Sequence, residues 1–308
     1  MSVADEESTA IIMTVPVKAS LQSDIAINTA TGAMYVTNSI ANDISVIDVS
    51  TDAVLASVPV GTNPVGLAVN PNTNLVYIAN QDDSSVTVID GTTNSAVSII
   101  SGIDSPFGIA ANEATNKIYV TEFTSGSIKV IDGNTNSVTA TITDVGNNPA
   151  RIAINPVTNK VYVTDASTAR VYVIDGNNNS VSSIADGAIT SPFGIGINSN
   201  TNKIYVSNFQ LGEGSVVVID GVTDTVSAVV PFPSSAEPYY VAVDPVLNEI
   251  IVTNAVGGFV KIIDGNTNAI IANMLTPSSP VGIAVLPSSH KVYVVETTAS
   301  IVSVGANQ

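Results

Sequence analysis

The sequence predicts an all-β protein, a seven-bladed β-propeller in which each blade is a sheet of four antiparallel strands. The first observation is a motif centred on Tyr-Val, with Tyr-Ile in one copy and Ile-Val in another, that recurs at intervals of 42 to 46 residues. The second is that each complete repeat holds four short apolar runs. The third is that the last repeat lacks its fourth run, while an extra run stands near the N-terminus. The motifs are centred on Tyr35, Tyr77, Tyr119, Tyr162, Tyr205, Ile251 and Tyr293.

The four runs are clearest between residues 149 and 187, where they cover 152–155, 160–164, 171–176 and 180–184. They are rich in Val, Ile, Tyr and Thr, and residues such as Asn, Asp, Gly and Pro separate them. β-Branched and aromatic residues favour strands, and the separating residues favour tight turns. We interpret the recurrent Asp-Gly pairs as hairpin turns rather than calcium loops, and we expect almost no helix.

The two ends of the chain predict how the ring closes. Residues 281–286, 290–296 and 300–304 supply three strands of the last blade, and residues 10–17 resemble the fourth run of the first repeat, 53–60. Residues 10–17 should therefore be an N-terminal outer strand that completes the last blade and removes an exposed edge. We expect residues 10–308 to form the single propeller domain and residues 1–9 to form a disordered acidic tail.

The composition excludes several functions. With 26 acidic and 9 basic residues the net charge is −17, which argues against nucleic acid as a partner. The absence of Cys excludes disulfides, thiol catalysis and thiolate metal sites, and a single His excludes paired-histidine metal motifs. No apolar run approaches the roughly 18 to 20 residues of a transmembrane helix.

The repeats resemble a known family. Tyr-Val-Thr-Asn at 35–38, with close variants at 119–121, 162–164 and 205–208, and Val-Ile-Asp-Gly-Asn-Thr-Asn at 130–136 are similar to the YVTN-repeat β-propellers. The resemblance covers residues 10–308 and implies an extracellular or cell-surface protein of the secreted, surface-layer type. The first residues do not read as a signal peptide, so this location is expected from the resemblance alone.

Two Ser-Pro-Phe-Gly-Ile strings, at 105–109 and 191–195, also resemble propellers related to virginiamycin B lyase. The elimination chemistry of that family relies on histidine bases near the central channel, and the one histidine here, His290, is predicted in a turn on the opposite face. This second resemblance therefore implies the fold and not the activity.

Departures from the repeat predict a binding site on one rim of the channel. Where the innermost strand begins, most repeats have Gly, but three carry Asp24, Arg151 and Tyr240 instead. Aromatic residues gather on the same rim, either just before that position or in the loop after the second strand. They are Phe107, Phe123, Phe193, Phe209 and Tyr239. The alternative is that these aromatic residues plug the channel mouth while Arg151 neutralises Asp165 or Glu122.

Three functions fit this sequence. The first is a non-enzymatic, monomeric propeller at the cell surface that binds a protein or glycan partner through the rim and needs no cofactor. The second is a metal-dependent hydrolase of the lactonase type, with Ca²⁺ or Mg²⁺ held at the channel mouth by oxygen ligands. Those ligands would be Glu122, Asp165, Asn208 and Glu296, which end the second strands of four repeats. The third is a structural cell-surface module without a site.

Overall fold

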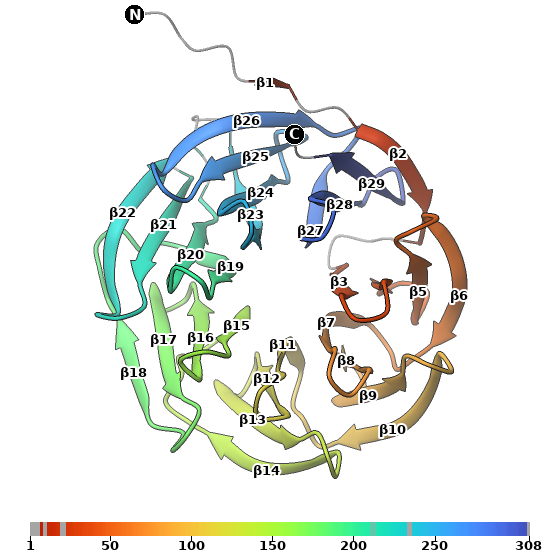
Figure 1. Ribbon diagram of the computed structural model, residues 1–308. Coiled ribbons are helices and arrows are strands. Elements are labelled where there is room, and N and C mark those ends of the chain that lie inside the picture. Colours follow the sequence, from red (N-terminus) through yellow and green to blue (C-terminus); the bar gives the residue numbers. More distant parts are fainter. Residues whose placement is uncertain are drawn as a thin grey trace, which may run out of the picture.

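Seven sheets of antiparallel strands surround a central channel in the computed structural model (Figure 1). The structure describes residues 7–8, 11–18, 23–210, 212, 214–232 and 236–306. Within these ranges there is no helix, and so no helical segment that could span a membrane. The predicted all-β, seven-bladed propeller with four antiparallel strands in each blade is confirmed.

Each blade runs outward from the channel in chain order. In blades 1 to 3 the strands are β3 (Ile25–Asn28), β4 (Ala33–Asn38), β5 (Asp43–Asp48), β6 (Ala53–Pro59); β7 (Pro64–Asn70), β8 (Leu75–Asn80), β9 (Ser85–Asp90), β10 (Ser95–Ser101); and β11 (Pro106–Asn112), β12 (Lys117–Glu122), β13 (Ser127–Asp132), β14 (Ser137–Ile142). In blades 4 to 6 they are β15 (Ile152–Asn155), β16 (Lys160–Asp165), β17 (Arg170–Asp175), β18 (Val181–Ile184); β19 (Pro192–Asn198), β20 (Lys203–Asn208), β21 (Ser215–Asp220), β22 (Thr225–Pro231); and β23 (Pro238–Asp244), β24 (Glu249–Asn254), β25 (Phe259–Asp264), β26 (Ala269–Leu275).

Blade 7 closes the ring with strands from both ends of the chain. It consists of β27 (Pro280–Leu286), β28 (Lys291–Glu296), β29 (Ile301–Ala306) and, outermost, β2 (Ile11–Pro16). β2 is antiparallel to β29, with Val15 opposite Val302, and Figure 1 shows the two strands side by side. The predicted closure by an N-terminal outer strand is therefore confirmed.

Only part of the predicted acidic tail falls within the structure. Residues 1–6 and 9 lie outside the described residues, as does residue 10 of the predicted closing strand. Glu7 and Ser8 form a short strand, β1 (Glu7–Ser8), which pairs in parallel with the outer strand β26 of blade 6.

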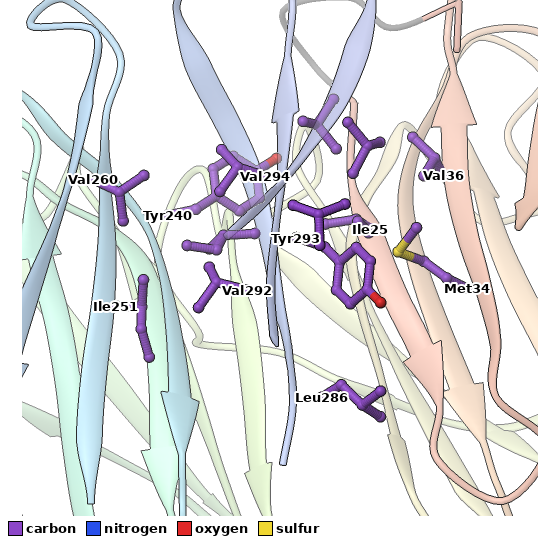
Figure 2. Packing of buried hydrophobic residues seen from close by; sticks show 14 of the residues in the cluster. Ile25, Met34, Val36, Tyr240, Ile251, Val260, Leu286, Val292, Tyr293 and Val294 are labelled. Atoms are coloured by element: carbon purple, nitrogen blue, oxygen red, sulfur yellow. The ribbon is translucent and has the colours of Figure 1, made fainter. Parts of the chain in front are cut away.

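The core lies between neighbouring blades. Each blade packs face to face with two others, so its second and third strands are covered on both sides and read as near-continuous apolar runs rather than alternating ones. The anchor tyrosines are fully buried in these layers. Figure 2 shows one such layer, in which Tyr293 of β28 packs near Met34 of blade 1 on one side and Ile251 and Val260 of blade 6 lie on the other.

Several anchor tyrosines also reach the turns of the next blade through their hydroxyls. Tyr162 donates to Asp224 at 3.0 Å and Tyr293 donates to Asp52 at 3.2 Å. Burial together with nearby Asp132 raises the pKa of Tyr77 to about 12. The hydroxyls of Tyr162 and Tyr293 thus each fasten a blade to its neighbour.

On the face that bears the turns between first and second strands, a clasp joins neighbouring blades. The clasp is an amide hydrogen bond of 2.6 to 2.8 Å from the last residue of an inner strand to the turn residue of the next blade. The turn residues have φ between 51° and 58°, a conformation that Asn tolerates better than most residues. The bonds run from Asn28 to Asn74, Asn70 to Asn116, Asn112 to Asn159, Asn155 to Asn202 and Asn198 to Asn248.

Between blades 6 and 7 the clasp has different chemistry. Here Asp244 and His290 replace the two asparagines, with Oδ2 and Nδ1 separated by 2.7 Å. The single histidine of the chain is thus a turn residue, on the face where the sequence predicts it.

Candidate functional site

Seven positions, one for each blade, surround the mouth of the channel, and we call them the inner-ring positions. Glycine is needed at most of them because the neighbouring backbone comes very close. An added Cβ would lie 2.2 Å from the Phe107 carbonyl oxygen at Gly66 and 2.0 Å from the Tyr239 carbonyl oxygen at Gly194. The seven residues are Asp24, Gly66, Gly108, Arg151, Gly194, Tyr240 and Gly282.

Hydroxyl groups of the second strands hold the inner-ring residues in place. The backbone N–H groups of Asp24, Arg151 and Tyr240 donate at 2.8 to 3.1 Å to Thr37, Thr164 and Thr253. The Thr164 hydroxyl in turn donates to the Phe193 carbonyl oxygen of the next blade at 2.7 Å. The threonine of the Tyr-Val-Thr motif therefore positions the residues of the site and fixes the spacing of the blades.

Asp24 and Arg151 form an ion pair across the channel. Arg151 Nη1 lies 3.0 Å from Asp24 Oδ2 and thereby joins blade 4 to blade 1. The expectation that Arg151 neutralises Asp165 or Glu122 is wrong, because the ring geometry brings it to a carboxylate 127 positions away in the chain. Burial raises the pKa of Asp24, while the charge of Arg151 and the N–H groups of Ile25 and Leu67 oppose that rise.

Three aromatic rings enclose the Arg151 guanidinium. Its Cζ lies 4.2 Å from the ring centre of Tyr240, 4.9 Å from that of Phe107 and 5.5 Å from that of Phe193. Guanidinium groups are attracted to aromatic faces, more strongly when water is removed. This enclosure helps to hold a charged side chain that is only 6% exposed.

The remaining aromatic residues extend the cluster over the rim. Phe193 and Tyr239 stack almost in parallel, with ring centres 4.4 Å apart. Phe209 lies 5.2 Å from Tyr239, and Phe123 lies 5.4 Å from Phe107. The structure thus brings all eight residues predicted for the binding site into one continuous cluster.

A pocket of about 530 Å³ opens beside this cluster, and we call it the rim pocket. Its aromatic walls are Phe123, Phe193, Phe209 and Tyr239. Phe107 and Tyr240 do not line it but support it from within the channel. The sequence reasoning missed the remaining lining residues, which are Asn148, Ala150, Ala166, Ser167, Ala255 and Val281.

A sequence signal for the missed residues exists. Ala150 and Val281 occupy the same repeat position as Phe107, Phe193 and Tyr239, directly before the inner-ring position. A small residue in a position that is aromatic in other blades leaves room beside the aromatic walls. The contrast of small and large residues at one repeat position is therefore a sequence signal for Ala150 and Val281.

The four residues predicted as metal ligands lie in four different blades, where they anchor loops. Each accepts a backbone N–H from the loop that leads into the inner strand of its own blade. The bonds are Asp104 N to Glu122 Oε1 (2.7 Å), Asn147 N to Asp165 Oδ2 (2.6 Å), Thr190 N to Asn208 Oδ1 (3.1 Å) and Ser278 N to Glu296 Oε2 (2.7 Å). Across the described ranges, no three His, Cys, Asp or Glu side chains are grouped to hold a metal ion, and the cation site stays a prediction.

Comparisons with known proteins support the fold. No protein-family model matches the chain, and no curated protein matches it in sequence. Among solved structures, a chain of Kuenenia stuttgartiensis hydrazine synthase is similar over 96% of this chain and 97% of its own, with a TM-score of 0.84 and 17% identity. The RRP9 WD40 repeats match over 98% of this chain and 99% of their own, with a TM-score of 0.85 and 11% identity.

The structure of U3-55K is also similar, covering 95% of this chain and 96% of its own with a TM-score of 0.80 and 10% identity. At these identities the likeness concerns the propeller fold alone. The resemblance to YVTN repeats stays a prediction that rests on the repeat motifs.

Proposed function

We propose that this propeller is a non-enzymatic binding module, and that it holds a protein partner by receiving an apolar side chain in the rim pocket. The observation that carries this proposal is the pocket itself, about 530 Å³ in volume and walled by four aromatic rings. Pockets that bind ligands commonly measure about 300 to 1,000 Å³ and are lined mainly by apolar and aromatic side chains. Buried aromatic residues also dominate the binding energy at protein interfaces.

The chemistry of the walls favours a protein over a glycan. Apart from the hydroxyl of Tyr239, the polar side chains of the rim pocket are Asn148 and Ser167, and Asn148 Nδ2 already donates to the Phe123 carbonyl oxygen at 3.0 Å. Sugar hydroxyls that enter such a pocket would lose hydrogen bonds to water without replacing them. An aromatic or branched aliphatic side chain loses none and gains the full benefit of burial.

The proposal places the protein at the cell surface, and this location rests on the resemblance to YVTN repeats. The proposal also takes the protein to be a monomer. The ionic groups in the channel support a role without catalysis, since Asp24 and Arg151 neutralise each other.

The proposal can be tested with a displayed library of random peptides, with a glycan array as the competing probe. We expect the selected peptides to share an aromatic or branched aliphatic residue. Phe209→Ala should weaken their binding at least about tenfold, because Phe209 is a pocket wall and is 37% exposed, so the fold should tolerate its loss. Ile99→Ala removes an exposed apolar side chain from β10, away from the rim, and should change nothing.

Two outcomes would contradict the proposal. Peptides that bind Phe209→Ala as tightly as the unchanged protein would show that the rim pocket is not the site. Binding of glycans alone, lost in the same variant, would show that the partner is not a protein.

A further inference from the structure

The loops that surround the rim pocket are rich in negative charge. Four loops lead into the inner strands of blades 3 to 6, and each of them contains one Asp or Glu that is not buried. Apart from Arg151, neither these loops nor the loops after the second strands of the same blades contain a Lys or Arg. The four carboxylates belong to Asp104, Asp144, Asp186 and Glu237.

Two of these carboxylates stand beside walls of the rim pocket. Asp104 is followed by Ser105, whose carbonyl oxygen accepts from the N–H of Phe123 at 3.2 Å. Glu237 comes two residues before Tyr239, and two residues span at most about 7 Å of chain. The pocket is lined by residues of blades 3 to 7, and Asp104 belongs to blade 3 while Glu237 belongs to blade 6. The two carboxylates therefore lie on different sides of the pocket.

Among the described residues, no cation pairs with any of the four carboxylates. Two arginines follow these loops in the chain, and both have other partners. Arg151 forms the ion pair with Asp24 at 3.0 Å. Arg170 donates at 2.9 Å to Ser183 on the outermost strand of blade 4. Uncompensated negative charge beside an apolar pocket favours a partner that carries positive charge near its apolar group.

We infer that the side chain received by the rim pocket is flanked by Lys or Arg, so that the partner presents a basic segment. This inference rests on the proposed function, because it names the chemistry around the side chain that enters the pocket. Exposed charges attract one another over about 10 Å in roughly 0.1 M salt, so a carboxylate acts here without lining the pocket. Because Asp104 and Glu237 lie on different sides, basic residues on both sides of the anchor benefit. The attraction acts mainly on the rate of association and on the choice of partner.

Three related peptides test the inference. The tightest peptide from the displayed library is remade with Lys, Gln or Glu on both sides of its aromatic or branched aliphatic residue. At about 0.05 M salt the Lys-flanked peptide should bind at least about fivefold more tightly than the Gln-flanked one, and the Glu-flanked peptide should bind least tightly. At about 1 M salt the three affinities should converge, because screening removes the attraction. Equal affinities in low salt would overturn the inference.

Two matched variants test whether the effect arises at the rim. Glu237→Gln removes a charge beside the pocket, and Glu113→Gln makes the same change in an exposed turn on the opposite face. Glu237→Gln should weaken the Lys-flanked peptide about threefold and leave the Gln-flanked peptide unchanged, and Asp104→Asn should add to the loss. Glu113→Gln should bind every peptide like the unchanged protein. Equal weakening by the two Gln variants, or no weakening by either, would contradict the inference.

Phe209→Ala separates this inference from the proposed function. It should weaken the Lys-flanked and Gln-flanked peptides by the same factor, because it removes a wall of the pocket and no charge. If it weakens both while the flanking residues make no difference, the inference fails and the protein partner stands. If it weakens neither peptide, the proposed function and the inference fail together.

Discussion

At the scale of single residues, the Asp24–Arg151 pair behaves as one unit. Both residues stand at inner-ring positions, where four other blades have glycine. The opposite charge of each residue allows the other to be buried. Breaking a buried pair leaves one charge without compensation, whereas replacing both charges by apolar groups is often nearly neutral. The pair thus links blades 1 and 4 across the channel without a backbone contact.

This reasoning gives a prediction for stability. Asp24→Leu should lower the free energy of unfolding by about 3 kcal/mol, because Arg151 stays buried and charged. Adding Arg151→Met should recover most of that loss, and both variants can be compared by urea or thermal unfolding. A double variant no more stable than the single one would show that the pair is not the source of the loss.

The residues of the site show where sequence reasoning ends. Asp24, Arg151 and Tyr240 stand out because they interrupt a column of glycines, and the aromatic residues stand out by repeat position. The partner of Arg151 could not be deduced in this way, because that choice depends on which side chains face each other across the ring. Repeat positions define the distance of a residue from the channel, but contacts between distant blades require the full geometry.

At the scale of strands and loops, the residue that ends the second strand accepts a backbone N–H from the loop before the inner strand in blades 3 to 7. In blade 7 this residue is Glu296, which accepts from Ser278 and from Ser303. Burial raises the pKa of Glu296, and its hydrogen bonds to the two serines only partly offset that effect. The native state therefore holds the proton of this carboxyl more tightly than the unfolded chain does.

The sign of this shift sets a pH dependence. A raised native pKa adds stability that is present below the unfolded pKa and is lost as the pH rises through the native pKa. The unchanged protein should therefore lose stability relative to Glu296→Gln as the pH rises from about 4 to 7, since Gln has no charge to bury. Urea unfolding at several pH values measures the difference, and a constant difference would contradict the prediction.

The clasps between blades make a second prediction at this scale. His290→Ala should destabilise the protein by about 1 to 3 kcal/mol, because Oδ2 of the buried Asp244 carboxylate loses its bond to His290, while Oδ1 keeps the N–H groups of Val246 and Leu247. The double variant Asp244→Asn, His290→Asn reproduces the pair found at five other junctions and should stay within about 1 kcal/mol of the unchanged protein. Thermal unfolding distinguishes the two, and a double variant as unstable as His290→Ala would argue against equivalent clasps.

At the scale of the whole molecule, the fold follows from local patterns that repeat. Val, Ile and Tyr runs form strands, Asn and Asp residues form the turns between them, and the missing fourth run at one end matches the extra run at the other. Each of these signals is local or compares one repeat with another, so the fold and its closure are predictable from the sequence. The rim pocket depends on side chains from five blades, and only its four aromatic walls could be predicted.

Closure of the ring by β2 leads to the last prediction. Val15 is 2% exposed and packs in the core of blade 7, so a chain lacking residues 1–17 should leave this core and the edge of β29 uncovered. Its melting temperature should fall, and a synthetic peptide of residues 9–18 should raise it in a concentration-dependent manner, because the peptide binds only the folded ring. The same peptide carrying Val15→Asp serves as the control and should have little effect. If both peptides raise the melting temperature equally, or neither raises it, β2 does not close the ring through Val15 and its pairing with β29.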